Sequence, residues 1–170
     1  LLWSYDKSAN KTANVSSPVY FNDAIFTASG YGTGGGLAKL VKNDDGFVAE
    51  PGYFLKSMQN HHGGMVLVDG HLYGFGSNSL ICVNFETGEI AWQDRSVSKG
   101  SLTYADGHLY CFGEKNSVAL VEANPKEYVE KGRFDVEKHD HPTWAHPVVA
   151  NGRLYLRDMN NLTCYKVSAE

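Results

Sequence analysis

Five side chains that could bind a small molecule occupy matching positions in different parts of the chain. His62, Lys99 and Trp144 each precede an Asx-Gly pair by seven residues, and Ser101 and His146 precede theirs by five. In a β-strand, residues two apart project from the same face, so all five can line one surface. Imidazole, ammonium, hydroxyl and indole groups together suit an anionic or sugar-like ligand. Lys99 would supply the counter-charge and Trp144 a stacking surface.

The same residues predict neither a metal centre nor a hydrolytic centre. A zinc site needs three or four ligands that converge at about 2.0–2.1 Å. His61 and His62 would point to opposite faces of a strand and could not easily serve one ion. Ser101 could be a nucleophile beside His62 or His146 as a base, but only their expected proximity suggests it. The sequence has no Gly-x-Ser-x-Gly elbow. We therefore expect no catalytic residue, no metal ligand and no cofactor.

The elements that must position these residues are four copies of one hairpin. The four copies are residues 22–26, 69–73, 106–110 and 151–155, which read Asn-Asp-Ala-Ile-Phe, Asp-Gly-His-Leu-Tyr, Asp-Gly-His-Leu-Tyr and Asn-Gly-Arg-Leu-Tyr. An Asx-Gly pair suits a type I′ turn, because both of its central residues need positive φ. The copies start 47, 37 and 45 residues apart, a period typical of propellers and solenoids. The chain is therefore predicted to be an all-β propeller.

Four blades' worth of four-stranded repeats can be assigned along the chain. The blades are expected at residues 14–55, 62–94, 99–136 and 144–168, with a separate outer strand at 1–7. That outer strand could complete the last blade and close a small ring. The alternative is half of a larger, probably eight-bladed propeller. In either case the innermost strands line a central channel, and the five binding residues surround its mouth. The glycine-rich stretch 31–36 is expected to be a loop.

Composition agrees with a strand-rich chain that does not bind nucleic acid. The 170 residues carry a net charge of -4, and no basic stripe is visible. The sequence contains no apolar run of about 18 residues, the length that would predict a membrane span. Cys82, Cys111 and Cys164 are expected to be small buried residues rather than a disulfide framework.

One segment resembles the repeat signature of the pyrroloquinoline quinone (PQQ)-like propellers. Residues 83–92 contain Glu86-Thr87-Gly88 followed by Trp92, and Trp3 echoes Trp92 near the start of the chain. The phrases at residues 64–70, 100–110 and 146–158 extend the resemblance, which is closest to the C-terminal part of secreted bacterial PQQ-like repeat proteins. The resemblance implies that Gly88 makes a turn and that Trp3 and Trp92 pack between neighbouring blades.

The resemblance implies two functions. The first is a non-catalytic scaffold that binds a small molecule or a protein at the channel face, since this family includes such members. The second is a fragment of a quinoprotein alcohol dehydrogenase-like oxidoreductase, with PQQ and calcium as cofactors. True PQQ dehydrogenases use adjacent cysteines, and this chain has no Cys-Cys pair, so the scaffold is favoured. The resemblance further implies a secreted or periplasmic location, with self-association or missing blades completing the ring.

Overall fold

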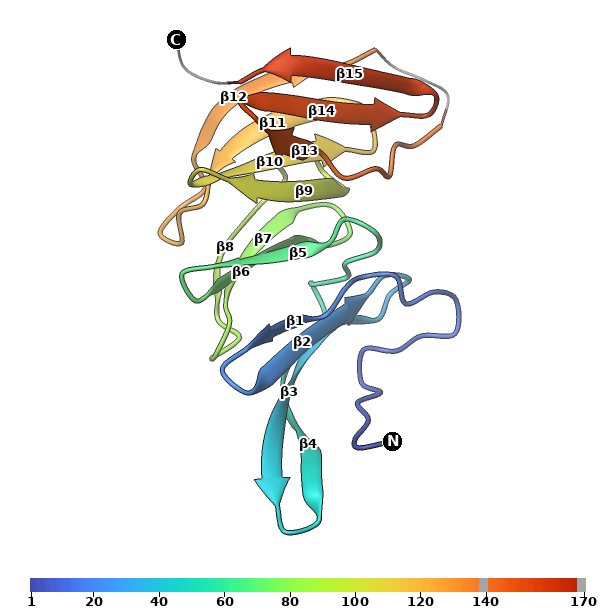
Figure 1. The fold of residues 1–170 in the computed structure, drawn as a ribbon, viewed down its shortest axis with the longest axis vertical. Coiled ribbons are helices and arrows are strands. Elements are labelled where there is room, and N and C mark those ends of the chain that lie inside the picture. The colour runs from blue at the N-terminus through green and yellow to red at the C-terminus, as the bar shows by residue number, and fades with distance from the viewer. Residues whose placement is uncertain (138–140, 168–170) are drawn as a thin grey trace.

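The computed structural model describes residues 1–137 and 141–167, and in these ranges the chain forms four antiparallel sheets (Figure 1). The first three sheets have four strands each and the fourth has three. The strands are β1 (Val19–Phe21), β2 (Ala24–Ser29), β3 (Gly34–Asn43), β4 (Gly46–Leu55), β5 (Met65–Val68), β6 (His71–Phe75), β7 (Leu80–Asn84), β8 (Ile90–Asp94), β9 (Gly100–Ala105), β10 (His108–Gly113), β11 (Ser117–Glu122), β12 (Glu130–Asp135), β13 (Val148–Ala150), β14 (Arg153–Asp158) and β15 (Asn161–Lys166). No helix in these ranges could cross a membrane.

A two-residue turn joins the first two strands of every sheet, as the sequence predicts. In the turn between β5 and β6, Asp69 has φ 47° and Gly70 has φ 74°. The other three turns likewise have positive φ at both central residues. Asn22 and Asp23 achieve this without a glycine, with φ of 47° and 54°, because Asn and Asp tolerate the left-handed region better than other side chains. Local turn chemistry therefore sets the register of all four hairpins.

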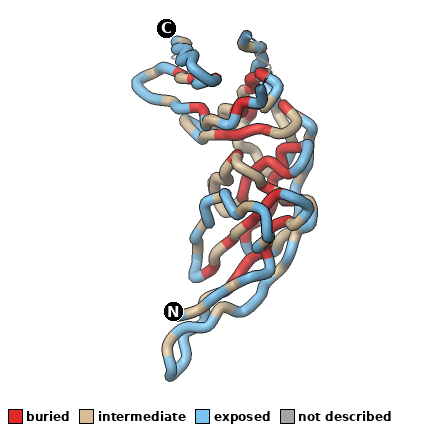
Figure 2. Tube along the Cα trace, turned by 90° about the vertical axis from the view of Figure 1, so that its right-hand side faces the viewer, coloured by how far each residue is buried: buried red, intermediate tan, exposed pale blue. Residues whose placement is uncertain are grey.

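The sheets follow one another along the long axis of the molecule (Figure 1). Within the described part of the chain, the strands of each sheet contact only strands of the neighbouring sheets. Contacts between the innermost strands run from β1 to β5, from β5 to β9 and from β9 to β13. Apolar clusters fill the spaces between consecutive sheets, and the largest lies between the second and third. In Figure 2 the buried stretches accordingly concentrate in the middle of the stack. The innermost strands thus hold their leading ends close together.

The four sheets form an open arc rather than a closed ring. Among the described residues, the first and fourth sheets make no contact, and they lie toward opposite ends of the stack (Figure 1). The expected outer strand at residues 1–7 is absent, since these residues adopt no strand conformation. Pairing with β15 would have required the two ends of the arc to meet. Trp3 consequently lies outside any sheet and is only partly buried, so its expected position between blades is wrong.

The N-terminal segment instead packs on the first sheet. The Ser29 hydroxyl donates a hydrogen bond to the Ser8 carbonyl at 2.5 Å, and Ser8 is buried. The Tyr5 hydroxyl lies so close to Gly36 that a Cβ there would approach it to 2.1 Å. Much of the glycine-rich stretch expected as a loop is therefore strand: at Gly35 a Cβ would lie 2.6 Å from the ring of Phe26. Glycine here provides close packing rather than flexibility.

None of the described residues covers the outward face of the fourth sheet. Cys82 in β7 pairs with Tyr73, and Cys164 in β15 pairs with Tyr155, so the two cysteines occupy equivalent positions. Cys82 is fully buried because the third sheet covers it, whereas Cys164 is exposed. The expectation that all three cysteines are buried therefore holds for Cys82 and Cys111 and fails for Cys164, which has no further sheet beside it.

Gly88 and Trp92 connect the second sheet to its two neighbours. Gly88, with φ 77°, faces the ring of Tyr53 in β4, which a Cβ would approach to 2.4 Å. Trp92 in β8 donates a hydrogen bond from Nε1 to the Asn124 carbonyl at 2.7 Å and packs edge-on against Tyr128. Both contacts cross between sheets. The indole of Trp92 is nevertheless only partly buried.

Candidate functional site

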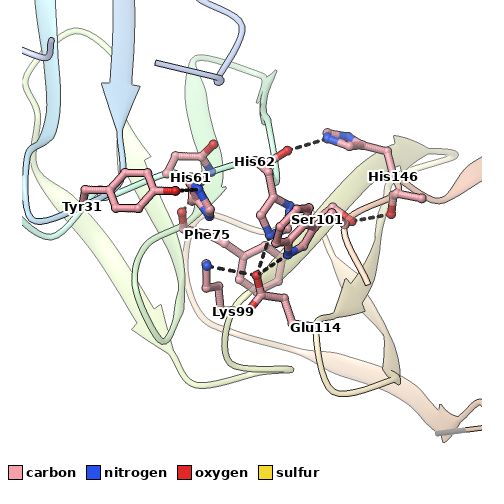
Figure 3. A network of polar contacts seen from close by, with 11 residues as sticks. Tyr31, His61, His62, Phe75, Lys99, Ser101, Glu114 and His146 are labelled. Atoms are coloured by element: carbon pink, nitrogen blue, oxygen red, sulfur yellow. Dashed lines mark hydrogen bonds and ion pairs between the residues drawn. The ribbon is translucent and has the colours of Figure 1, made fainter. Parts of the chain in front are cut away.

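A single carboxylate gathers three of the five predicted binding residues. Oε1 of Glu114 lies 2.8 Å from His62 Nε2 and 2.9 Å from Lys99 Nζ, and it accepts a hydrogen bond from Trp144 Nε1 at 3.1 Å. We call these four residues the Glu114 cluster (Figure 3). The side chains of His62 and Glu114 are 9% and 19% exposed, whereas Trp144 is 56% exposed. The cluster thus combines a largely buried acid with an accessible aromatic face.

The other two predicted residues lie beside the cluster and bind backbone. His146 places Nε2 2.8 Å from the carbonyl oxygen of His62. Ser101 is fully buried and donates a hydrogen bond to the carbonyl of Ala145 at 2.9 Å (Figure 3). Both contacts join innermost segments of different sheets. His146 and Ser101 therefore hold the mouth together, and Ser101 is not accessible to a ligand.

The four residues of the cluster come from the second, third and fourth sheets. His62 precedes β5, Lys99 precedes β9 and Trp144 precedes β13, while Glu114 directly follows β10. The backbone fixes these positions, because Glu114 N–H donates to the Lys99 carbonyl at 2.9 Å. The segment before β5 is held by Asn60, which is fully buried. Its side-chain amide donates to the carbonyls of Gly64 and Phe75, each at 2.9 Å.

Burial and hydrogen bonding have opposite effects on the charges in the cluster. Burial raises the pKa of Glu114, but the hydrogen bonds from Lys99 and His62 outweigh it, so the pKa lies below its ordinary value of 4.5. Burial lowers the pKa of His62 below 6.5, and the bond to Glu114 only partly offsets this. His62 is therefore a neutral imidazole near pH 7, and it contacts an ionised carboxylate. Lys99 is already paired with this carboxylate, which differs from its expected role as a free counter-charge.

His61 and His62 lie on the same side of the chain, contrary to the sequence prediction. Residues 61–64 are a bend and not a strand, so side chains do not alternate between faces there. The two rings lie 5.2 Å apart, centre to centre. His61 Nε2 lies 2.9 Å from the Tyr31 hydroxyl, and the two rings meet edge to face (Figure 3). The expectation that His61 and His62 point to opposite faces of a strand is therefore wrong, and it gives no reason against their binding one ion.

A shallow cavity of about 270 Å³ opens beside the cluster. Its lining includes Tyr31, His61 and Lys99, together with Gly30 and Ser77. Gly30 and Ser77 each lie eight residues after the first residue of their hairpin turn, as Glu114 does. The cavity therefore lies where the ends of the second strands meet the leading ends of the innermost strands.

Glu114, His61 and Tyr31 are the site residues that the sequence prediction missed. The repeat contains a signal for the first of them. Counting eight residues on from each turn gives Gly30, Ser77, Glu114 and Met159, and the single charged residue in this set is the one at the centre of the cluster. No such signal exists for Tyr31 in the turn between β2 and β3, or for His61 in the irregular segment before β5.

Comparison with known proteins places the fold but not the function. No protein family and no curated protein matches the sequence. BamB from Moraxella catarrhalis superposes with a TM-score of 0.59 at 14% identity, over 88% of this chain and 41% of BamB. A europium-containing methanol dehydrogenase gives 0.56 at 15% identity, over 76% of this chain and 26% of the enzyme. The computationally designed Ika4 protein gives 0.62 at 7% identity, over 99% of this chain and 98% of Ika4.

These similarities define the class of protein. BamB and the methanol dehydrogenase are β-propellers, and this chain has the same all-β architecture of radially arranged antiparallel sheets. The chain spans less than half of either natural protein. At such identities the shared fold carries no activity with it.

Proposed function

We propose that this propeller is a non-catalytic binding module whose ligand is a neutral, sugar-like molecule at the Glu114 cluster. The observation that carries the proposal is the exposed indole of Trp144, which a hydrogen bond holds against a mostly buried carboxylate. An aromatic face beside fixed polar groups suits a polyhydroxylated ring, which stacks through its C–H face and hydrogen-bonds through its edge. Glu114 already neutralises Lys99, which favours a neutral ligand over an anionic one.

The proposal is tested by calorimetric titration of the chain with a panel of neutral and acidic oligosaccharides. We expect neutral members to bind and Trp144→Ala to abolish binding while leaving the melting temperature unchanged, since Trp144 is 56% exposed. Trp3→Ala is the matched control, because Trp3 lies outside the sheets. Absence of saccharide binding would overturn the proposal, as would binding that survives in Trp144→Ala.

The competing function is an oxidoreductase fragment that binds PQQ and calcium. The likeness to a methanol dehydrogenase supports it at the level of fold alone. Ligand binding to the native state raises the free energy of unfolding by RT ln(1 + [L]/Kd), and the melting temperature rises with it. A rise on addition of PQQ with calcium would favour the oxidoreductase and an unchanged melting temperature would favour the binding module.

We further infer that other blades complete the arc, either from a second copy of the chain or from a longer polypeptide. The uncovered face of the fourth sheet supports this, with Val148 and Leu162 54% and 70% exposed. Light scattering separates the two sources. A species of twice the 18.7 kDa chain mass supports a second copy, and a stable monomer at high concentration supports a longer polypeptide. A secreted or periplasmic location, expected from the PQQ-like resemblance, belongs to the same proposal.

A further inference from the structure

Three potential metal ligands converge at the mouth of the arc. One ligand atom from each of His61, His62 and Glu114 lies within 4.8 Å of those of the other two. Two of these residues are neighbours in the chain, and the third comes from a different sheet. Two imidazoles and one carboxylate are the ligand set of many three-residue zinc sites, which keep a fourth position open.

The histidines carry hydrogen-bonding capacity that nothing in the described chain satisfies. Nδ1 of His61 and Nδ1 of His62 are both buried, and neither has a hydrogen-bond partner among the described residues. Only 9% of the His62 side chain is exposed. Buried polar atoms are rarely left unpaired, and a missing ion is one physical reason for an exception.

The surrounding contacts match those that orient metal-binding histidines. His61 engages its Nε2 with the Tyr31 hydroxyl. Such a contact fixes ring orientation and tautomer, and a hydrogen bond donated from Nε2 leaves Nδ1 with a lone pair for a cation. His62 presents Nε2 to the carboxylate of Glu114, itself one of the three ligands, so this nitrogen and this oxygen already face one another before any ion arrives.

We propose that His61, His62 and Glu114 bind a divalent first-row transition ion such as zinc. Lys99 shares the Glu114 oxygen that lies closest to His62, so its ammonium group competes with the ion for the carboxylate. Binding of the ion displaces Lys99 toward the adjoining cavity, which Lys99 already lines. The inference goes beyond the saccharide proposal, because it concerns a different ligand and does not require Trp144.

The test is calorimetric titration of the full chain with zinc chloride, with cobalt absorption as a second readout of ligand geometry. We expect one ion per chain. His61→Gln should weaken binding by at least about tenfold, and it leaves every contact of Glu114 in place. His71→Gln is the matched control, because its ring binds the Asp69 carbonyl in a hairpin turn and its loss should change nothing. Lys99→Met should tighten binding.

Three results separate this inference from its alternatives. Zinc affinity that is equal in wild type and His61→Gln would overturn it, as would the absence of a one-site isotherm. Glu114→Gln should also weaken binding, and its melting temperature must be measured because three side chains contact Glu114. Trp144→Ala should lose saccharide binding but still bind one zinc ion per chain, because the three ligands remain, so failure of the binding-module proposal and failure of the metal site give different patterns.

Discussion

At the scale of single residues, Glu114 organises the mouth. A mostly buried carboxylate is costly unless its oxygens are paired, and here an ammonium, an imidazole and an indole all contact the same oxygen. The sequence predicted the three partners from their shared position in the repeat. It did not predict what they share, because the contacts of Glu114 with His62 and Trp144 cross from one sheet to another and depend on how the sheets pack.

The buried histidines make stability depend on pH. The pKa values of His61 and His62 are lowered below 6.5, mainly by burial, so below that value the unfolded chain binds protons that the folded chain excludes. Stability therefore falls as pH drops through 6.5 toward the lowered pKa values of the folded state. Below 4.5 it falls further, since the pKa of Glu114 is also lowered in the folded state.

Thermal unfolding measured across this range checks the pH dependence. The double variant His61→Gln, His62→Gln should show a shallower loss of melting temperature than wild type. The control is His71→Gln, His108→Gln, which removes the two hairpin histidines and should keep the wild-type slope. Equal slopes for wild type and the His61, His62 variant would contradict the assignment.

At the scale of elements, contacts between sheets depend on a few positions with strict steric demands. The sequence predicted the four hairpin turns because positive φ at Asx-Gly pairs is a local property. It failed at residues 1–7, since a strand forms only beside a partner, and the partner's location is a property of the whole arc. It failed at Gly35 for a similar reason. The ring of Phe26 excludes any side chain there, but this contact exists only once β2 and β3 have paired.

Two glycines with the same backbone conformation separate turn strain from docking. Gly88 and Gly107 have φ of 77° and 76°, but a Cβ would meet the Tyr53 ring at the first and open space at the second. Gly107→Ala should cost about 1 kcal/mol from strain alone. Gly88→Ala should cost about 1–3 kcal/mol more, because it overpacks the contact with the first sheet. Denaturant unfolding measures both, and equal losses would show that Gly88 does not dock the sheets.

Trp92→Ala should destabilise the chain through the contact between the second and third sheets. We expect a loss of about 3 kcal/mol, the low end for removal of a large aromatic side chain, because the indole is only partly buried. Ile90→Ala in the same strand is the control. Because Ile90 is 38% exposed, this substitution should change the free energy of unfolding by no more than about 1 kcal/mol. A Trp92→Ala variant as stable as Ile90→Ala would refute the docking role.

At the scale of the whole molecule, the arc has a covered end and an uncovered end. The N-terminal segment packs on the first sheet through Ser8 and Tyr5, whereas nothing among the described residues covers the outward face of the fourth. Two of the cysteines report this difference directly. Cys82 in β7 and Cys164 in β15 occupy equivalent positions, yet Cys82 is buried and Cys164 is exposed.

Thiol labelling with a chromogenic disulfide reagent should detect one fast cysteine in the folded chain and three after denaturation. Cys82 and Cys111 should be protected, because burial excludes the reagent and also raises their pKa, to about 11 for Cys82. Cys164→Ser should remove the fast phase. If blades from a second copy of the chain cover the fourth sheet in solution, Cys164 should react slowly at high protein concentration. Its fast labelling should return on dilution.

Among the described residues, the strands of each sheet contact only strands of neighbouring sheets, although His146 before β13 also binds the carbonyl of His62 before β5. The arc is therefore close to energetically one-dimensional, like a repeat array in which stability is a sum of unit and interface terms. The fourth sheet has one interface and three strands, whereas the second has two interfaces and four strands. Its backbone amides should therefore exchange with deuterium earliest, through local opening that leaves the second and third sheets intact. Such a gradient would make the terminal sheet the part of the chain that proteases attack first.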